Sequence, residues 1–244
     1  MERNIIPQIK ICGITDIRET EYLNEYGVDY AGFVFYPPSK RNVTIDKAVQ
    51  IAKELDPVIK KVAVLVSPDV SQIEAIQEAG FADILQIHKD IDIRVLRAAD
   101  LPVWRAVNIS SMHNLDDAAY MNEIDADMLT AEITDMESDL LTAKITDTDE
   151  DLLTAKITAI VVDAPDFGSG KTFDWGTGEI KIKPNLKFIL AGGLNASNVA
   201  EGIRIFGPNI VDVSSGVEGE HGKSREKIAE FVKAVREFKH QEEQ

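Results

Sequence analysis

The chain of 244 residues carries a formal net charge of −16 and is 44% hydrophobic, so it has enough apolar residues for a sizeable core. The acidic balance argues against a nucleic-acid partner, and no apolar run is long enough to span a membrane. The N-terminus lacks the apolar core of a signal peptide and the single cysteine forms no intrachain disulfide, so we expect a cytoplasmic protein.

Apolar, β-branched runs alternate with helical patterns along the chain. In chain order, the expected strands are 8–14, 30–35, 61–66, 84–88, 103–109, 159–164, 188–191 and 210–214. The expected helices are 16–26, one capped by Thr44 that runs to Leu55, 70–79, 93–99, one capped by Asn195 or Ser197 that runs to Phe206, and 224–239. Gly27 and Gly80 are expected to end the first and third helices.

Eight strands in alternation with helices predict an α/β fold with a parallel sheet, and eight is the number that closes a (βα)8 TIM barrel. We therefore expect one barrel domain over residues 1–244. An open, doubly wound sheet is the alternative. The first strand-to-helix turn has no G-x-G-x-x-G sequence, which argues against dinucleotide binding.

Residues 112–158 interrupt this alternation with 13 acidic residues and two lysines. A tandem repeat of period twelve reads DMLTAEITDMES at 127–138, DLLTAKITDTDE at 139–150 and DLLTAKIT at 151–158. Twelve residues rotate a helix by about 120° beyond three full turns, so the apolar patches form no single stripe. We expect the fifth helix near 115–121, and residues 125–158 as an acidic elaboration between the fifth and sixth strands.

Residues 147–151 lack the glycine and final glutamate of an EF-hand loop, so a solvated turn is favoured over a calcium site.

Polar side chains recur at the carboxyl ends of four expected strands. By strand alternation, the pairs that share a face are Lys10 with Cys12, Gln86 with His88, Val161 with Asp163, and Asp212 with Ser214. Barrel active sites lie at this end, so the shared position predicts a site. Taken singly, Cys12 fits a small buried hydrophobe, His88 a structural histidine, and Asp163 a turn cap.

Glycine-rich loops follow the last two strands, where barrels commonly bind phosphate through main-chain N–H groups. The expected phosphate contacts are Gly192, Gly193, Ser214, Ser215 and Gly216. Residues 168–172 read GSGKT, but a complete P-loop would need glycine at Pro165. We expect a mobile glycine loop that covers a site, with Lys171 as a contributor to phosphate binding.

Six segments together resemble the phosphoribosylanthranilate isomerase family, (βα)8 enzymes of tryptophan biosynthesis. They are KICGIT at 10–15, GFVFYPPSKR at 32–41, LQIH at 85–88, GSGKTFDW at 168–175, AGGLN at 191–195 and VDVSSGVE at 211–218. The resemblance covers nearly the whole chain apart from the repeats. Lys89 and Phe167 stand where the family usually has glycine.

The resemblance implies an Amadori rearrangement of N-(5-phosphoribosyl)anthranilate to 1-(2-carboxyphenylamino)-1-deoxyribulose 5-phosphate by general acid–base catalysis. It assigns Asp163 as the acid that opens the ribose ring and Cys12 as the base at C2. A neutral aspartic acid needs a raised pKa and a basic thiolate a lowered one. Lys10 lies on the face of Cys12, where its charge favours the thiolate.

The resemblance also places Arg41 against the anthranilate carboxylate, although a solvated loop arginine is the simpler interpretation of that residue alone. Lys10, His88 and Asp212 are expected to bind substrate, and Asp212 alternatively holds a loop. No metal or organic cofactor is implied, since the substrate provides its own iminium electron sink. The expected partner is a small phosphorylated substrate, and the expected state is a monomer or a homodimer.

Two other functions remain open. The isomerase of histidine biosynthesis performs the same rearrangement, but typically has a carboxylate where Cys12 stands. A non-catalytic barrel that binds partners through its repeats is a second alternative, and the presence of Cys12, Asp163 and Arg41 argues against it.

Overall fold

The computed structural model describes residues 6–108, 156–163 and 185–238. Its elements, in chain order, are β1 Gln8–Cys12, α1 Glu19–Tyr26, β2 Tyr30–Phe35, α2 Ile45–Ala52, β3 Lys60–Val66, α3 Val70–Ala79, β4 Ile84–His88, α4 Ile93–Ala98, β5 Val103–Asn108, β6 Ile157–Asp163, β7 Lys187–Leu190, α8 Val199–Phe206, β8 Ile210–Val213, the 3₁₀ turn η3 Ser215–Val217, β9 Glu218–Gly219, β10 Gly222–Lys223 and α9 Arg225–Arg236.

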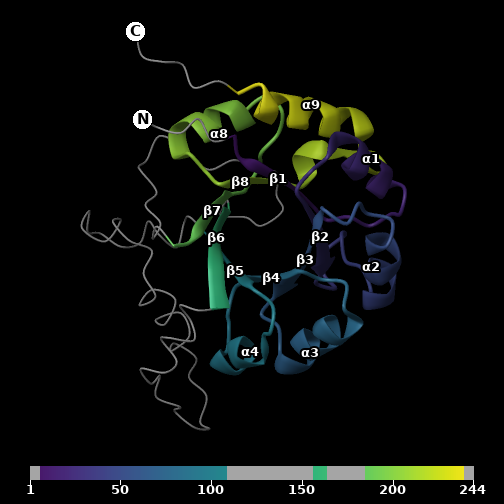
Figure 1. Cartoon of the computed structure of the whole chain (residues 1–244), viewed down its shortest axis with the longest axis vertical. Helices are drawn as coiled ribbons and strands as arrows, with labels where there is room; N and C mark the ends of the chain where they lie inside the picture. The colour runs from purple at the N-terminus through teal and green to yellow at the C-terminus, as the bar shows by residue number, and fades with distance from the viewer. Residues whose placement is uncertain (1–5, 109–155, 164–184, 239–244) are drawn as a thin grey trace, which may run out of the picture.

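The eight strands β1 to β8 form a closed barrel in sequential order. Every neighbouring pair is parallel, and β1 pairs with both β2 and β8, so the sheet has no free edge. Figure 1 shows the ring of strands with the described helices around its outside. This closure confirms the predicted (βα)8 barrel and excludes the open sheet.

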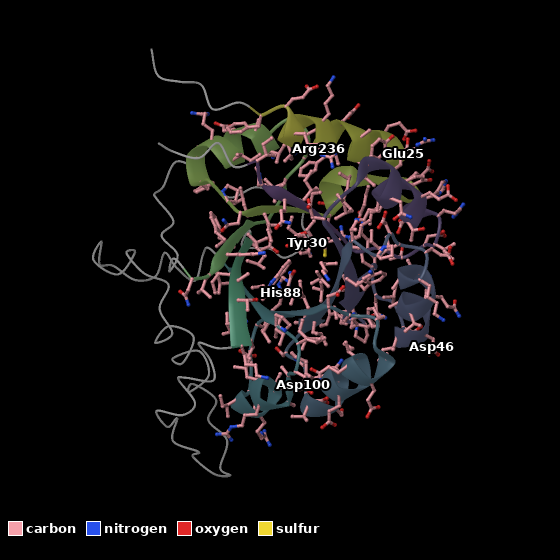
Figure 2. All side chains as sticks on the ribbon, viewed as in Figure 1. Glu25, Tyr30, Asp46, His88, Asp100 and Arg236 are labelled. Atoms are coloured by element: carbon pink, nitrogen blue, oxygen red, sulfur yellow. The ribbon has the colours of Figure 1, made fainter. Side chains whose placement is uncertain are left out.

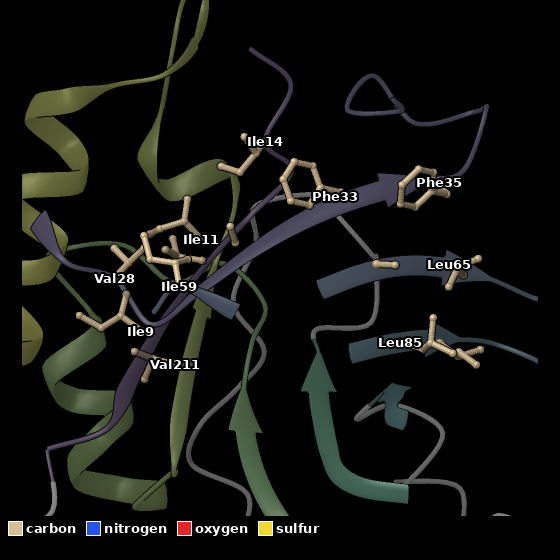
Figure 3. Close-up of a cluster of buried hydrophobic side chains, with 14 of the residues drawn as sticks. Ile9, Ile11, Ile14, Val28, Phe33, Phe35, Ile59, Leu65, Leu85 and Val211 are labelled. Atoms are coloured by element: carbon tan, nitrogen blue, oxygen red, sulfur yellow. The ribbon is translucent and has the colours of Figure 1, made fainter. Parts of the chain in front are cut away.

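The core has two layers, as strand alternation requires. One cluster joins outward-facing strand residues to buried helix residues, such as Ile11 with Phe231. Figure 3 shows part of this cluster, with Ile9, Ile11 and Val211 close together on β1 and β8. The other cluster lies inside the barrel, where Tyr30 and Trp104 stack edge to face with ring centroids 5.0 Å apart. Apolar side chains therefore fill the barrel interior toward the amino ends of the strands, and the predicted site lies toward their carboxyl ends.

Several predicted ends are correct because local chemistry determines them. The hydroxyl of Thr44 accepts a hydrogen bond from Lys47 N at the start of α2. Gly27 and Gly80 adopt the left-handed conformation directly after α1 and α3, with φ of 55° and 66°. In α9, the predicted apolar stripe is buried, namely Ile228, Phe231, Val232 and Val235.

Other predicted ends are wrong by a few residues. β1 ends at Cys12 because the N–H groups of Gly13 and Ile14 both donate to one carbonyl, Gly32 O. α1 begins at Glu19, not at Asp16, because the Glu19 carboxylate accepts the N–H groups of Thr15 and Asp16 in a turn before the helix. α2 ends at Ala52 instead of Leu55, and α9 ends at Arg236, short of 239.

The expected cap of α8 is confirmed only in part. The helix begins after Asn198, which has no side-chain capping bond. Asn195 caps the turn that leads into it, because its Oδ1 accepts from Ser197 N at 2.9 Å and its O accepts from Val199 N at 3.1 Å. The Asn198 amide instead accepts from Asn195 N and donates to Gly193 O. This side chain therefore stabilises the loop after β7 instead of capping the helix.

The acidic segment lies almost entirely outside the described residues, including the expected fifth helix near 115–121. β6 begins at Ile157 instead of 159, and it pairs with β5 from Val103 onward. The last two residues of the third repeat therefore belong to the barrel.

Candidate active site

Inward-facing residues change from apolar to polar toward the carboxyl ends of the strands. On β4 the inward side chains run from Ile84 through Gln86 to His88. On β8, Ile210 is followed by Asp212. Lys10, Gln86, His88 and Asp212 are all buried, and Figure 2 shows His88 and Tyr30 directed into the ring of strands. The polar side chains thus gather at the carboxyl end of the barrel, where Lys10 is close enough to lower the pKa of His88.

Lys10 is held by an ion pair across the junction of the first and last strands. Its Nζ donates to Asp212 Oδ2 at 2.8 Å, and the Lys10 side chain is 0% exposed. Burial alone would lower the pKa of Lys10, but Asp212 and Cys12 raise it above its ordinary value. Lys10 therefore remains a cation.

Cys12 is the last residue of β1 and is partly exposed. Burial raises the pKa of its thiol above the ordinary value, while the charges of Lys10 and Lys223 act to lower it. The lowered pKa that a basic thiolate needs is therefore not provided by the described side chains alone, because burial and the charge of Asp212 outweigh both cations. Lys10 acts in the predicted direction, and Lys223 is a second cation that the sequence did not indicate.

His88 is a neutral imidazole at physiological pH. Burial, Lys10 and Arg105 together lower its pKa to about 3. Gln86 Nε2 lies 2.9 Å from His88 Nε2. The two side chains are therefore hydrogen-bonded, and the tautomer of the ring determines which of them donates.

Two buried oxygen atoms next to Lys10 and His88 are hydrogen-bond acceptors that no described residue uses. Among the described residues, neither Gln86 Oε1 nor Asp212 Oδ1 has a hydrogen-bond partner. A buried acceptor without a partner costs about 1–3 kcal/mol, so each is suited to accept from a ligand hydroxyl.

Arg41 lies directly against the start of the β1–α1 loop. A Cβ built on Gly13, whose φ is +81°, would lie 2.4 Å from Arg41 Cδ. Only glycine therefore allows the arginine stem to pass next to Cys12. The Arg41 side chain is 12% exposed and is not the solvated loop arginine of the simpler interpretation.

The partner of Arg41 is Glu218, the last residue of the VDVSSGVE motif, to which the sequence assigns no role. Arg41 Nε and Nη2 donate to Glu218 Oε1 and Oε2 at 2.5 and 3.2 Å. Lys40 and Lys223 also bind this carboxylate, at 3.0 and 3.2 Å. Burial alone would raise the pKa of Glu218, but hydrogen bonds and charges from its cationic partners lower it to about 2.

The two glycine loops meet at the expected phosphate end. Gly192 and Gly193 have φ of 84° and 64°, and a Cβ on Gly216 would lie 1.9 Å from Leu194 O. Ser214 Oγ donates to Cys12 O at 2.8 Å, and Ser215 begins η3. The loops after β7 and β8 are therefore packed against each other and against β1.

Asp163 is the last residue of β6 and is partly exposed. Residues 164–184 lie outside the described residues, so the expected role of Lys171 stays a prediction. Within the described ranges, no three His, Cys, Asp or Glu side chains gather as metal ligands. No helix in the same ranges is long and apolar enough to cross a membrane.

Comparison with known proteins agrees with this geometry. The sequence model of N-(5'-phosphoribosyl)anthranilate (PRA) isomerase matches residues 9–131 and 135–234. The N-(5'-phosphoribosyl)anthranilate isomerase of Streptococcus gordonii is 34% identical over 230 residues, which cover 94% of this chain and 98% of that protein. The enzyme of Clostridium acetobutylicum is 34% identical over 239 residues, 95% of this chain and 99% of its own.

Solved structures give the same result. The phosphoribosyl anthranilate isomerase of Thermotoga maritima superposes with a TM-score of 0.68 at 28% identity, covering 94% of this chain and 98% of that one. A complex of such an isomerase with reduced 1-(o-carboxyphenylamino)-1-deoxyribulose 5-phosphate has a TM-score of 0.67 at 27% identity, with the same coverage. By the extent of these matches, the chain belongs to the N-(5'-phosphoribosyl)anthranilate isomerase family.

Proposed function

We propose that the chain catalyses the Amadori rearrangement of N-(5-phosphoribosyl)anthranilate to 1-(2-carboxyphenylamino)-1-deoxyribulose 5-phosphate, a step of tryptophan biosynthesis. The observation that carries the proposal is the contact of the Arg41 stem with Gly13, next to Cys12. The contact places Arg41, whose guanidinium can bind a carboxylate, next to Cys12, whose thiol can transfer a proton. The substrate has the same arrangement, since its anthranilate carboxylate lies close to the reacting C1 and C2 atoms of the sugar.

In the first step, Asp163 donates a proton to the ring oxygen, the C1–O bond breaks, and C1 becomes an iminium carbon. In the second, the Cys12 thiolate removes the proton at C2, and the electron pair forms the C1–C2 double bond of an enolamine. The enolamine then tautomerises to the ketone. The iminium places a positive charge near the thiol, which lowers the thiol pKa at the step that needs the thiolate.

Binding is divided among the remaining polar groups. The main-chain N–H groups of the glycine loops bind the phosphate, through Gly192, Gly193, Ser214, Ser215 and Gly216. Arg41 binds the anthranilate carboxylate with a guanidinium fork. Asp212 Oδ1, which is open, accepts from a ribose hydroxyl, while Lys10 holds the other oxygen of that carboxylate. Neutral His88 lines the same space.

A reactive, unpaired cysteine at the centre of the mechanism requires a reducing compartment. The chain has one cysteine. We infer that the reaction takes place in the cytoplasm.

The test is a fluorescence assay, because anthranilate fluorescence decays when the N-glycoside isomerises. Cys12→Ala and Asp163→Asn are each expected to lower kcat at least ~100-fold, the size typical of a lost general acid or base. Asp100→Asn, an exposed carboxylate between α4 and β5, is the matched control and should keep wild-type activity. Circular dichroism checks that each variant is folded. Near-wild-type turnover by either site variant would reject its role, and no decay with wild-type protein would reject the function.

A further inference from the structure

The short β9–β10 pair that follows η3 places one carboxylate against three cations. Glu218 begins β9 and binds Lys40, Arg41 and Lys223. We propose that Glu218, braced by Lys223, is a positioning residue that orients Arg41 toward the carboxylate of the substrate. The proposal rests on the proposed function of Arg41 and adds to it a residue that controls how the guanidinium is presented.

The pairing geometry leaves one edge of the guanidinium available. Glu218 binds Arg41 side-on, through Nε at 2.5 Å and Nη2 at 3.2 Å. Nη1 of Arg41 has no hydrogen bond to any residue in the described part of the chain. A guanidinium has five N–H donors in a planar fork, so Nη1 and the second N–H of Nη2 form an end-on edge for another carboxylate. Glu218 thus fixes the plane of the fork without occupying that edge.

Lys223 is the buried end of the brace. Its side chain is 1% exposed, and its Nζ lies 3.2 Å from Glu218 Oε1. The same Nζ donates to Ser214 O at 3.0 Å and to Ser214 Oγ at 3.3 Å. Because Ser214 Oγ donates to Cys12 O at 2.8 Å, the brace is connected to both β8 and β1. The position of Arg41 is therefore linked to that of Cys12 through a chain of side-chain hydrogen bonds that ends on the Cys12 carbonyl.

Another carboxylate, the buried side chain of Glu19, holds the β9–β10 pair in place. Glu19 Oε1 accepts from Lys223 N at 2.7 Å, and Glu19 Oε2 accepts from Thr15 N at 2.7 Å. A Cβ on Gly222, whose φ is +117°, would lie 2.6 Å from Glu19 Oε1. Glu19 thus joins the β9–β10 pair to the β1–α1 loop at Thr15, two residues after Gly13.

A competing role for Glu218 makes the opposite prediction. If its carboxylate only occupies Arg41 until substrate arrives, removing its charge releases the guanidinium and tightens substrate binding. If it positions Arg41, the same change frees the fork to rotate and weakens binding. The direction of the change in affinity therefore separates the two roles.

The experiment compares wild-type protein with Glu218→Gln. Steady-state kinetics give kcat and KM, and calorimetry gives the affinity for reduced 1-(2-carboxyphenylamino)-1-deoxyribulose 5-phosphate, which needs no turnover. We expect KM and Kd to rise about tenfold, the size of one charge-assisted hydrogen bond, and kcat to stay within about threefold. Glu220→Gln is the matched control, because Glu220 lies in the same hairpin turn with its side chain 88% exposed. It should match wild type.

A double-mutant cycle with Arg41→Ala shows whether Glu218 acts through the arginine. In that background, Glu218→Gln should change Kd by less than about twofold. A purely structural role would lower the active fraction and hence kcat, with Kd of the folded protein unchanged. Unchanged or tighter binding in Glu218→Gln, or additive effects in the cycle, would overturn the proposal.

Glu218→Asp provides the same test if Glu218→Gln does not fold. It keeps a negative charge beside Lys223, but it withdraws the carboxylate from Arg41 by one methylene, so weaker analogue binding is again expected. Wild-type protein that binds the analogue without isomerising the substrate would reject the proposed function, and the ratio of Kd values would still decide the role of Glu218. Wild-type protein that binds no analogue would overturn both.

Discussion

At the scale of single residues, His88 gives the protein a pH dependence. Its pKa is about 3 in the folded state and about 6.5 when unfolded, so between these values the unfolded chain binds more protons. The stability contributed by the neutral ring is thus complete above about pH 6.5 and is lost as the pH falls below it. Between pH 6.5 and 5, wild-type protein should lose up to about 2 kcal/mol more unfolding free energy than His88→Gln.

Urea unfolding at pH 5, 6, 7 and 8 measures this difference. His221→Gln is the matched control, because its side chain is 87% exposed, and it should follow the wild-type profile. Glu218, with a pKa of about 2, loses its contribution only at lower pH, as the pH falls from about 4.5. Parallel profiles for wild type and His88→Gln would show that burial does not suppress protonation of this ring.

At the scale of elements, the loop directly after β1 depends on Gly13, because only a residue without a side chain leaves room there for Arg41. Gly13→Ala introduces strain at φ +81° and a Cβ within 2.4 Å of Arg41 Cδ. We expect a loss of about 1–3 kcal/mol of unfolding free energy and, because Arg41 must move, a KM raised about tenfold. Gly207→Ala is the matched control, with φ +55° and no atom within 4 Å of the added Cβ. It should lose stability but keep the wild-type KM, and a similar KM for both variants would contradict the coupling to Arg41.

Strand periodicity explains which parts of the site the sequence could predict. Because alternation is a fixed property of a strand, the sequence alone predicts that Lys10 shares a face with Cys12, and that Gln86 shares one with His88. The closed barrel followed from the order and number of elements. These are local signals, and they identified the end of the barrel at which the candidate site lies.

Long-range pairing explains what could not be predicted. Glu218 and Arg41 are 177 residues apart, and Lys223 N and Glu19 are 204 apart, so no local pattern joins them. Only the motif VDVSSGVE marked Glu218, by resemblance and without a role. The raised pKa of Cys12 has a similar origin, because the sequence shows the adjacent Lys10 but not the loss of hydration that outweighs its charge.

At the scale of the whole molecule, the barrel closes where β1 meets β8, and one buried ion pair crosses that junction. Lys10 and Asp212 are direct partners in the strand register, with 0% and 8% of their side chains exposed. Lys10→Met should cost about 3–5 kcal/mol of unfolding free energy, because it leaves a buried carboxylate without its counter-ion. Adding Asp212→Asn should recover at least about half of that loss, since the uncompensated charge is then removed as well.

The matched control is Lys60→Met, which breaks the pair between Lys60 and Asp83 at 3.2 Å. Because 54% and 33% of these two side chains are exposed, the expected loss is below about 1 kcal/mol. Urea unfolding at pH 7 compares the three variants. Equal losses for Lys10→Met and Lys60→Met would mean that the junction depends on its strand hydrogen bonds and apolar packing alone. A larger loss for Lys10→Met, relieved by the second substitution, would show that the pair beneath the proposed catalytic cysteine also holds the first and last strands together.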